Sequence, residues 1–590
     1  MLLDGINDAK DIKRLAIDEL CVLCDEIRQV LINKLSNTGG HVGSNLGVVE
    51  LTAALHYVFD SPYDKIIWDV SHQCYAHKIL TGRKDAFIKP EMYKTVTGFT
   101  NKHESGHDFF TVGHTSTSVS AALGFARSRD TLKGKENIIA VIGDGALGGG
   151  QALEGINTLG EYEGNFILII NDNNQSVAEN HGGLYKHLKA LRDTEGESPD
   201  NIFRCFGLEY HYLGDGHDVK ALTKLFEKVK DITHPVVLHI HTLKGKGLPY
   251  AEENIEDWHS GAPFFIADGT PKNGYPVYDT TVFDSLENLL DTDPSAIVLT
   301  AGTPRALGYV GEKRESRAKE GRFIDVGIAE QNAMGIAGGI AGYGGNAVFG
   351  VYAPFLQRAY DQLSHDICLN SNPVTLLVLL PGAYGMKSNT HLGLCDIQLL
   401  SHIPNLIYLC PCDKQEYLAM LRYATAQKEY PVAIRVPCRF YEGSAEDDTD
   451  YSDINRARVM KQGKDCALIA TGSLIPKAME AARRYKEVSG RDITVINPRF
   501  LTGIDASLLW RLKKNHSLVI TWEDGELYGG YGQNIASYYS DCDMKVLNFG
   551  ITKEFHSDFN ADDLLADNGI SAENLITILS EYFPSGKVQG

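Results

Sequence analysis

Short apolar runs that alternate with helical patterns recur along most of this 590-residue chain. The first segment holds the runs 138–142 and 166–170, which are separated by a glycine-rich turn and a helical stretch over 146–159. A strand buried in a parallel sheet is apolar along its whole length, and a helix commonly connects it to the next parallel strand. The pattern therefore predicts α/β domains, each built on an open and largely parallel sheet.

The same alternation continues in two further segments. The predicted strands there are 296–300, 323–328, 347–352, 374–380, 406–410, 432–436, 467–472, 492–497 and 517–522. A turn-rich linker over 253–279 and a polar stretch over 442–453 separate the segments. We therefore expect three doubly wound domains in series, 1–280, 281–445 and 455–590, with ligands outside the carboxyl ends of the strands.

Charge and composition limit the partners of the chain. Its 56 Lys and Arg against 76 Asp and Glu give a net charge of −20, which argues against a nucleic-acid or anionic-membrane surface. Eleven cysteines, an odd number, do not indicate a disulfide framework, and Cys21 and Cys24 lie in a helical pattern. The uncharged stretch 332–357 holds seven glycines and predicts a helix, a turn and a buried strand. We expect a cytoplasmic protein that acts on small molecules.

Two polar motifs follow neighbouring strands of the first segment. The letters GDG (143–145) come directly after the first run, and NDN (171–173) ends the second. Since adjacent parallel strands end at one edge of a sheet, Asp144 and Asn173 would lie close together as oxygen ligands of Mg²⁺. Backbone N–H groups at the start of the next helix would face an anion, those of Gly145 and Ala146. The motifs together predict a Mg²⁺–diphosphate site.

This pair of motifs is the signature of thiamine-diphosphate enzymes, and the surrounding sequence resembles the 1-deoxy-D-xylulose-5-phosphate synthases, a transketolase-like family. The resembling blocks are 39–59, 64–83, 112–124, 325–333, 352–362 and 521–532. The resemblance implies a homodimer that uses thiamine diphosphate and Mg²⁺. It also implies that the enzyme joins pyruvate, with loss of CO₂, to glyceraldehyde 3-phosphate, for isoprenoid and thiamine biosynthesis.

The resemblance further implies which residues hold the cofactor. The metal ligands would be Asp144, Asn173 and the backbone carbonyl of Gln175. The diphosphate and thiazolium would be lined by Ser44, His72, His114 and Lys244. Glu330 would hydrogen-bond to the aminopyrimidine and Phe355 would stack on it. Because Glu330 and Asp144 belong to different predicted domains, the cofactor would bridge two domains.

Residues near the reacting atoms follow from the same resemblance. His41 and His391 would move the protons of addition and release. The residues assigned to the substrates are Tyr352, Arg358, Lys387 and Arg439. Two further histidines carry weaker indications, because single histidines are often structural: His259 and His77.

The acceptor side departs from the family pattern. Leu380 and Lys387 stand where the family has an arginine and an aspartate, and Cys438 stands where it has another arginine, with Arg439 one position later. Lys94 replaces a further arginine in a looser alignment, and AEQNA with Asn332 replaces AEQHA. Lysine does not reproduce the bidentate binding of phosphate by arginine. Either the phosphate site is rebuilt in another geometry or the acceptor is a different aldehyde.

Particular residues bear on three other possible functions. The letters HESGH (103–107) match the zinc-protease pattern, but Gly106 and Ser105 interrupt the helix that this chemistry needs, so a loop is predicted. A second enzyme hypothesis is a transketolase that acts on ketose phosphates. A requirement for pyruvate would distinguish the synthase from such a transketolase. A relative that binds the cofactor without turnover is disfavoured because Glu330, Asp144, Asn173 and His41 are all present.

Overall fold

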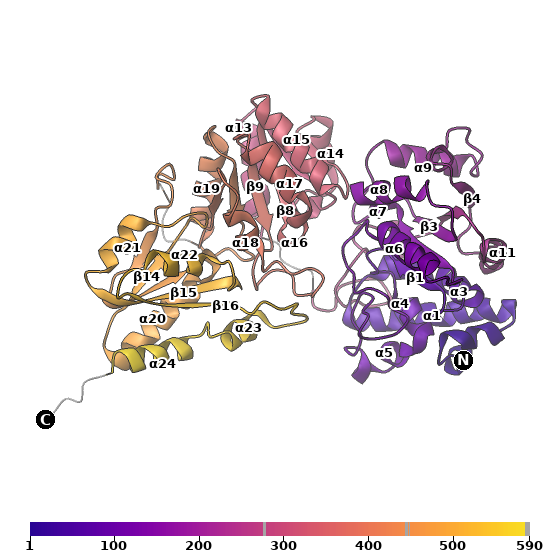
Figure 1. The fold of residues 1–590 in the computed structure, drawn as a ribbon, viewed down its shortest axis with the longest axis horizontal. Helices are drawn as coiled ribbons and strands as arrows, with labels where there is room; N and C mark the ends of the chain where they lie inside the picture. Colours follow the sequence, from indigo (N-terminus) through magenta and orange to yellow (C-terminus); the bar gives the residue numbers. More distant parts are fainter. Residues whose placement is uncertain (275–278, 443–446, 448, 585–590) are drawn as a thin grey trace. The chain divides into compact units, whose positions relative to one another are not determined.

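The computed structural model describes residues 1–274, 279–442, 447 and 449–584. Its Cα positions form two compact units (Figure 1). Unit 1 is Met1–Val277 with Gly327–Ala329, and unit 2 is Tyr278–Val326 with Glu330–Gly590. Unit 1 holds one sheet and unit 2 holds two.

The sheet of unit 1 is entirely parallel, with the strand order β1-β2-β3-β5-β4. Its strands are β1 Lys65–Trp68, β2 Ile138–Gly143, β3 Phe166–Asp172, β4 Glu209–Leu213 and β5 Pro235–His241. Side chains of β2 alternate between two cores: Ile138, Ala140 and Ile142 belong to one, and Ile139 and Val141 to the other. Both faces of the strand are therefore buried, which explains why the run is apolar without a break.

Helices cover both faces of this sheet (Figure 1). Helices α6 (Ser118–Thr131) and α8 (Gly150–Leu159) supply apolar residues to one core, and α3 (Val49–Val58) and α11 (Val219–Val229) to the other. The predicted helix over 146–159 is in fact two helices, because α7 (Asp144–Leu147) ends before α8 begins. A Cβ on Gly149 would lie 2.2 Å from the Ser116 hydroxyl, so the glycine lets the chain turn against that residue.

The first sheet of unit 2 is also parallel, with the order β10-β11-β9-β8-β6-β7. Its strands are β6 Ala296–Thr300, β7 Phe323–Asp325, β8 Asn346–Tyr352, β9 Thr375–Leu379, β10 Ile407–Leu409 and β11 Val432–Arg435. Strand β7 ends at Asp325, so the predicted strand over 323–328 is too long. Helix α15 (Glu330–Gly342) and β8 confirm the helix, turn and strand predicted within 332–357.

The second sheet of unit 2 has the order β12-β14-β13-β15-β16. Its strands are β12 Arg458–Lys461, β13 Asp465–Ala470, β14 Thr494–Asn497, β15 His516–Glu526 and β16 Lys545–Ile551. Only β12 runs antiparallel to its neighbour. The three sheets, each largely parallel, confirm the predicted fold class.

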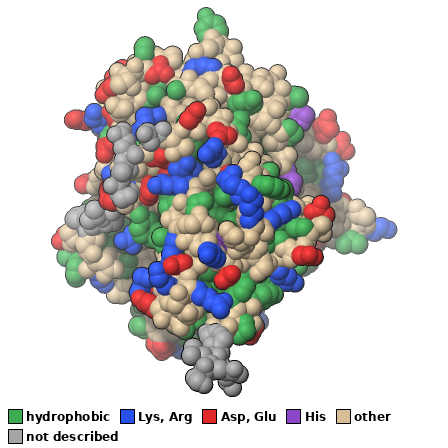
Figure 2. Space-filling view, turned by 90° about the vertical axis from the view of Figure 1, so that its left-hand side faces the viewer, with side chains coloured by type: hydrophobic (Ala, Val, Ile, Leu, Met, Phe, Trp, Pro, Cys, Tyr) green, Lys and Arg blue, Asp and Glu red, His purple; other side chains and the backbone are tan. Residues whose placement is uncertain are grey.

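On the face shown in Figure 2, basic and acidic side chains are interspersed, with small groups of apolar side chains between them. Within the described ranges, no helix is both long enough and apolar enough to span a membrane.

A buried carboxyl at the end of β15 predicts a pH dependence of stability. Glu523 is fully buried and accepts hydrogen bonds from the N–H groups of Tyr531 and Gly532, which open α22 (Tyr531–Tyr538). Burial raises the pKa of Glu523 to about 7. The unfolded carboxyl ionises near pH 4.5, so between these values the folded state binds the extra proton. The free energy of unfolding therefore falls as pH rises, by up to about 3 kcal/mol.

Glu523→Gln should remove this loss. In thermal scans, the difference in melting temperature between the variant and the unchanged protein is expected to grow in favour of the variant from pH 5 to pH 8. Glu581→Gln, on the exposed part of α24 (Ala572–Tyr582), is the control and should give parallel curves. Parallel curves for Glu523→Gln as well would show that the carboxyl titrates at its ordinary pH.

Candidate active site

The GDG and NDN motifs meet at the carboxyl edge of the unit 1 sheet, where Gly143 of β2 pairs with Asn171 of β3. Helix α7 begins directly at Asp144, whose side chain is buried. Asp144 Oδ2 accepts a hydrogen bond of 2.8 Å from Asn180 Nδ2. Among the described residues, no ion pair neutralises this carboxylate. Burial, and then the nearby Asp172, raises the pKa of Asp144 well above its usual range. Such a group suits a divalent cation.

The turn after β3 packs on the start of α7. Asn173 Oδ1 accepts from the N–H of Gln175 at 3.3 Å, and Gln175 Oε1 is buried with no hydrogen-bond partner among the described residues. A Cβ on Gly145 would lie 2.3 Å from the Cβ of Ser176, so this close approach requires glycine. The structure therefore brings Asp144 and the predicted ligands Asn173 and Gln175 to one end of the sheet. The chain continues into α9 (Gly183–Asp193).

Three imidazole rings gather in unit 1. The ring centroids of His41 and His72 lie 5.3 Å apart, and His259 lies 5.8 Å from His41 and 5.3 Å from His72. Lys244 Nζ donates to His259 Nδ1 at 3.1 Å and to the carbonyl of Ser176 at 2.6 Å, which ties this group to the turn after β3. His259, which the sequence indicated only weakly, thus belongs to the same group as His41.

Burial shifts the titration of His41 and Lys244. It lowers the pKa of His41 to about 4, with a smaller contribution from the Lys244 ammonium, and it lowers the pKa of Lys244 to about 8. At pH 7 the imidazole of His41 is therefore neutral and able to accept a proton, while Lys244 is mostly cationic. His41 Nδ1 is buried without a hydrogen-bond partner in the described chain.

The remaining predicted diphosphate-side residues lie on neighbouring segments. Ser44 is buried on α2 (Val42–Leu46), the short helix that follows His41. His114 precedes a segment held by Asp69, whose carboxylate accepts from the N–H groups of Ser116 at 2.7 Å and Ser118 at 2.9 Å. Asp69 was not singled out from the sequence, because a lone aspartate after an apolar run carries no signal of this long-range contact.

Unit 2 holds the second set of predicted residues. Glu330 opens α15 and is buried, which raises the pKa of its carboxyl, while Arg358 opposes this shift. Arg358 Nη1 lies 3.7 Å from Glu330 Oε2, and that oxygen accepts no hydrogen bond from the described residues. Arg358 therefore lies beside the predicted catalytic carboxyl.

An aromatic group lies in the same unit. Phe355, on α16 (Ala353–Leu356), meets Tyr352 edge-on at a centroid distance of 5.7 Å and His391 at 5.5 Å. Thr390 Oγ1 and His391 Nδ1 share a hydrogen bond of 2.8 Å, which orients the imidazole. The structure thus brings His391 next to Phe355, whose ring also contacts Tyr352, although His391 is far from both residues in the sequence.

The predicted phosphate-side cations are exposed. The backbone carbonyl of Lys387 accepts a hydrogen bond of 2.7 Å from the N–H of Asp558. The charge of Lys387 also helps to lower the pKa of Asp562, but it contributes less than Lys477 and Tyr384 do. Arg439 lies with its guanidinium 5.5 Å from the centroid of the Tyr441 ring. A role for either residue in binding the acceptor stays a prediction.

The zinc-protease hypothesis is wrong. Residues 103–107 form turns rather than a helix. Glu104 accepts from Lys78 Nζ at 2.6 Å, and His107 shares a hydrogen bond with Ser61. In the part of the chain that the structure describes, no three His, Cys, Asp or Glu side chains are placed to hold a metal. The predicted loop is confirmed.

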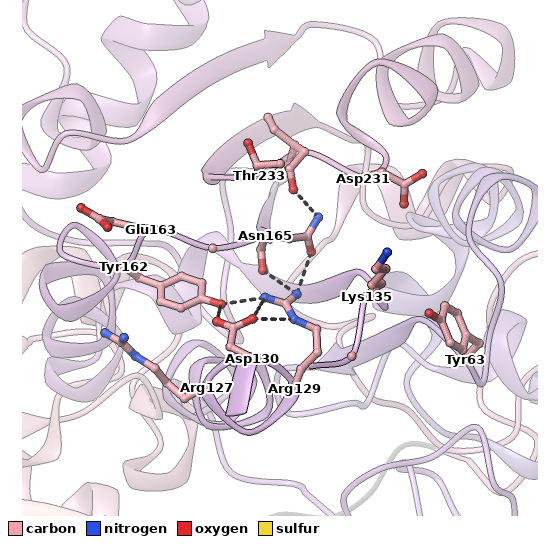
Figure 3. Close-up of a pocket in the computed structure, with 13 residues that line it drawn as sticks. Tyr63, Arg127, Arg129, Asp130, Lys135, Tyr162, Glu163, Asn165, Asp231 and Thr233 are labelled. Atoms are coloured by element: carbon pink, nitrogen blue, oxygen red, sulfur yellow. Dashed lines mark hydrogen bonds and ion pairs between the residues drawn. The ribbon is translucent and has the colours of Figure 1, made fainter. Parts of the chain in front are cut away.

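A cavity of about 750 Å³ lies at the opposite end of the unit 1 sheet (Figure 3). Its lining residues come from the C-terminal end of α6 and from the segments that precede β1, β2, β3 and β5. Arg129 there donates to Asp130, to the Tyr162 hydroxyl and to Asn165. None of the predicted site residues lines this cavity, so it is separate from the candidate active site.

Comparisons with known proteins first define the class. Residues 3–198 and 194–242 match the family described as 1-deoxy-D-xylulose-5-phosphate synthase. Residues 277–442 match the transketolase pyrimidine binding domain and 455–575 the transketolase C-terminal domain. The chain is thus a transketolase-type α/β protein.

Relatives then narrow the class to a family. The chain is 37% identical to the 1-deoxy-D-xylulose-5-phosphate synthase of Clostridium tetani, over 97% of this chain and 98% of that one. It is 38% identical to that of Clostridium beijerinckii, over 99% and 100%. A Campylobacter jejuni transketolase structure is 18% identical, with a TM-score of 0.43 over 96% of this chain and 100% of that one. The chain belongs to the 1-deoxy-D-xylulose-5-phosphate synthase family.

Proposed function

We propose that this chain joins pyruvate, with loss of CO₂, to glyceraldehyde 3-phosphate and so forms 1-deoxy-D-xylulose 5-phosphate. Relatives named for this product match the chain over nearly its whole length. The observation that carries the proposal is the buried Asp144 carboxylate beside the turn after β3, without a neutralising ion pair among the described residues. This donor set fits a Mg²⁺–diphosphate group.

Both units hold residues that are proposed for thiamine diphosphate. In unit 1, Asp144, Asn173 and the carbonyl of Gln175 would hold Mg²⁺. The side chains on the diphosphate and thiazolium would be Ser44, His72, His114 and Lys244, with N–H groups from Gly145 and Ala146. In unit 2, Phe355 would stack on the pyrimidine ring. When bound, the cofactor supplies an electron sink for the carbon chemistry.

Protons would be handled by the chain's own side chains. The buried Glu330 carboxyl, with Oε2 unbonded among the described residues, would hold a proton in a hydrogen bond to the aminopyrimidine. Neutral His41 would accept a proton at Nδ1. His391, held through Nδ1 by Thr390, would act on the substrate beside Tyr352. Arg358 would limit the rise in the pKa of Glu330 that burial causes.

The quaternary structure and location belong to the same proposal. We infer a cytoplasmic homodimer in which the glycine-rich helix α15 allows close packing of two copies. Tyr343, just beyond this helix, has 97% of its surface exposed in the single chain. Light scattering after size exclusion should therefore give twice the mass of 64.9 kDa.

A product analysis tests the reaction. Purified protein would be incubated with Mg²⁺, thiamine diphosphate and pyruvate, with and without glyceraldehyde 3-phosphate, and the products identified by mass spectrometry. We expect CO₂ and deoxyxylulose 5-phosphate, both lost when Mg²⁺ is chelated. Decarboxylation without the sugar phosphate would refute the proposed acceptor. Consumption of ketose phosphates but not pyruvate would indicate a transketolase instead.

The departures on the acceptor side lead to a prediction for Lys387. If its ammonium binds the acceptor phosphate, Lys387→Ala should raise the KM for glyceraldehyde 3-phosphate about tenfold, with kcat within about twofold. Lys477→Ala is the matched control, since Lys477 pairs with Asp562 at 2.9 Å, the carboxylate near Lys387. An equal rise in KM for both variants would show a general loss of charge rather than binding by Lys387.

A further inference from the structure

The loop that carries the HESGH letters also carries a phenylalanine that touches the histidine group. Phe99 meets His41 edge-on, with ring centroids 5.4 Å apart and planes at 68°. Of the rings described above, those of His72 and His259 also contact His41. Phe99 thus supplies an apolar wall to a side chain that the proposed function places at the reacting atoms.

The backbone before Phe99 is held by Glu104. Glu104 Oε1 accepts from the N–H of Thr97 at 2.7 Å, and its Oε2 accepts from Lys78 Nζ at 2.6 Å. Lys78 Nζ also donates to the carbonyl of Thr97 at 2.8 Å. Both backbone polar groups of Thr97 are therefore bound by a charged pair whose lysine is fully buried.

The backbone after Phe99 is held by two more buried side chains. The N–H of Thr100 donates to Ser71 Oγ at 2.9 Å, and the N–H of Asn101 donates to Asp108 Oδ2 at 2.9 Å. Ser71 and Asp108 are themselves buried, and Asp108 is paired with Arg83 at 2.6 Å. Charge-assisted hydrogen bonds of this kind are stronger than neutral ones, so the segment 97–101 is held rigidly on both sides of Phe99.

We propose that Phe99 is a positioning residue for His41, and that Glu104 positions Phe99 by holding Thr97. This inference rests on the proposed function, in which His41 moves a proton. The wall formed by Phe99 fixes the orientation of the imidazole and keeps water from it. The letters HESGH then have a role in this chain: their glutamate anchors a loop beside the active site rather than serving a metal.

The electrostatics of His41 agree with this geometry. The titratable groups that face its ring are Lys244, His72 and His259, and burial is the larger cause of its lowered pKa. Because a protonated imidazole loses more on burial than a neutral one, admitting water would favour the proton. Removing the Phe99 ring should therefore move the pKa of His41 upward, toward its usual value near 6.5.

Phe99→Leu tests the proposal without disturbing the buried Lys78–Glu104 pair. The readout is exchange of the imidazole C2 hydrogen of each histidine with deuterium, followed by mass spectrometry against pH on the protein without cofactor. We expect the exchange midpoint of His41 to rise, and kcat to fall about 10- to 100-fold with a smaller change in the KM for pyruvate.

Phe110→Leu is the matched control. Phe110 lies in the same loop and meets Phe125 edge-on at 5.4 Å, the same separation as between Phe99 and His41. This variant should leave the His41 midpoint and kcat unchanged. An unchanged His41 midpoint in Phe99→Leu, or an equal shift in Phe110→Leu, would overturn the positioning role of Phe99.

Glu104→Gln tests the anchor. The amide keeps the shape of the side chain but lacks the negative charge, so backbone amide exchange in a peptide covering 97–101 should speed up and the His41 midpoint should move as in Phe99→Leu. Protected amides in this variant would refute the role of Glu104. If the His41 midpoint shifts in Phe99→Leu but kcat is unchanged, the proposed role of His41 in catalysis is refuted instead. The experiment therefore distinguishes a failure of the positioning role of Phe99 from a failure of the proposed function.

Discussion

Glu330→Gln is expected to lower turnover of pyruvate by about 1,000-fold or more, because an amide cannot exchange the proton that a carboxyl holds. The substitution keeps the size of the side chain at the start of α15. Binding of thiamine diphosphate, followed by tryptophan fluorescence, should change by less than about threefold, since the residues proposed for the diphosphate lie elsewhere. Product formation would be measured by mass spectrometry with saturating Mg²⁺ and cofactor.

Two further variants test this assignment. Glu320→Gln, at the exposed end of α14 (Gly311–Lys319), removes the same charge and should retain full activity. Arg358→Met should raise the pKa of Glu330 further, because the guanidinium 3.7 Å away opposes the shift caused by burial. Any step in the pH profile that belongs to Glu330 would then move to higher pH. More than a tenth of the activity left in Glu330→Gln would exclude the carboxyl as an essential proton carrier.

Asp144→Asn is expected to weaken the activation by Mg²⁺ about 100-fold or more and to abolish activity at millimolar Mg²⁺. The reason is that the buried carboxylate is the charged member of the proposed ligand set, while the other members are a side-chain amide and a backbone carbonyl. The same substitution should, however, stabilise the protein when no metal is bound. Because Asp144 is buried without an ion pair in the described chain, removing its charge should raise the melting temperature of the metal-free protein.

Asp64→Asn is the matched control for Asp144→Asn. Asp64 is equally buried, but it precedes β1 and accepts from the N–H groups of Asp60 and Asn137, both at 2.7 Å. Losing these charge-assisted bonds should lower the melting temperature by several degrees, while the Mg²⁺ requirement stays unchanged. Calorimetry and Mg²⁺ titrations of activity would measure both effects. A Mg²⁺ requirement left unchanged by Asp144→Asn would exclude this residue as a ligand.

Most strands in the middle of the sheets were predictable because both of their faces are buried. The run 138–142 corresponds to β2, and 296–300 coincides with β6. Strands β1, β4, β5, β12 and β16 were missed. Four of them lie at the edge of a sheet, whereas β5 lies inside its sheet, and its sequence carries His239 and His241 among the apolar residues. An edge strand such as β16 is only partly buried, so its sequence mixes polar and apolar residues and lacks the continuous run.

The candidate site was predictable where it follows directly from strand ends. Asp144 and Asn173 were found because parallel strands adjacent in the sequence were assumed to be adjacent in the sheet, and β2 and β3 do pair. Asp69, by contrast, holds residues 47 and 49 positions away. No local pattern reports a contact of that kind, so it became visible only in the folded chain.

The sequence by itself determined the fold class, the family, and the residues proposed for the metal and the diphosphate, because periodic burial and short motifs are local properties of a chain. Only the tertiary structure decided what the HESGH letters do. Glu104 binds Lys78 and Thr97 rather than a metal. It likewise decided that His259 joins His41, and that Arg358 lies beside Glu330. Each of these outcomes depends on which distant side chains burial brings within hydrogen-bond or van der Waals distance, and packing sets that choice.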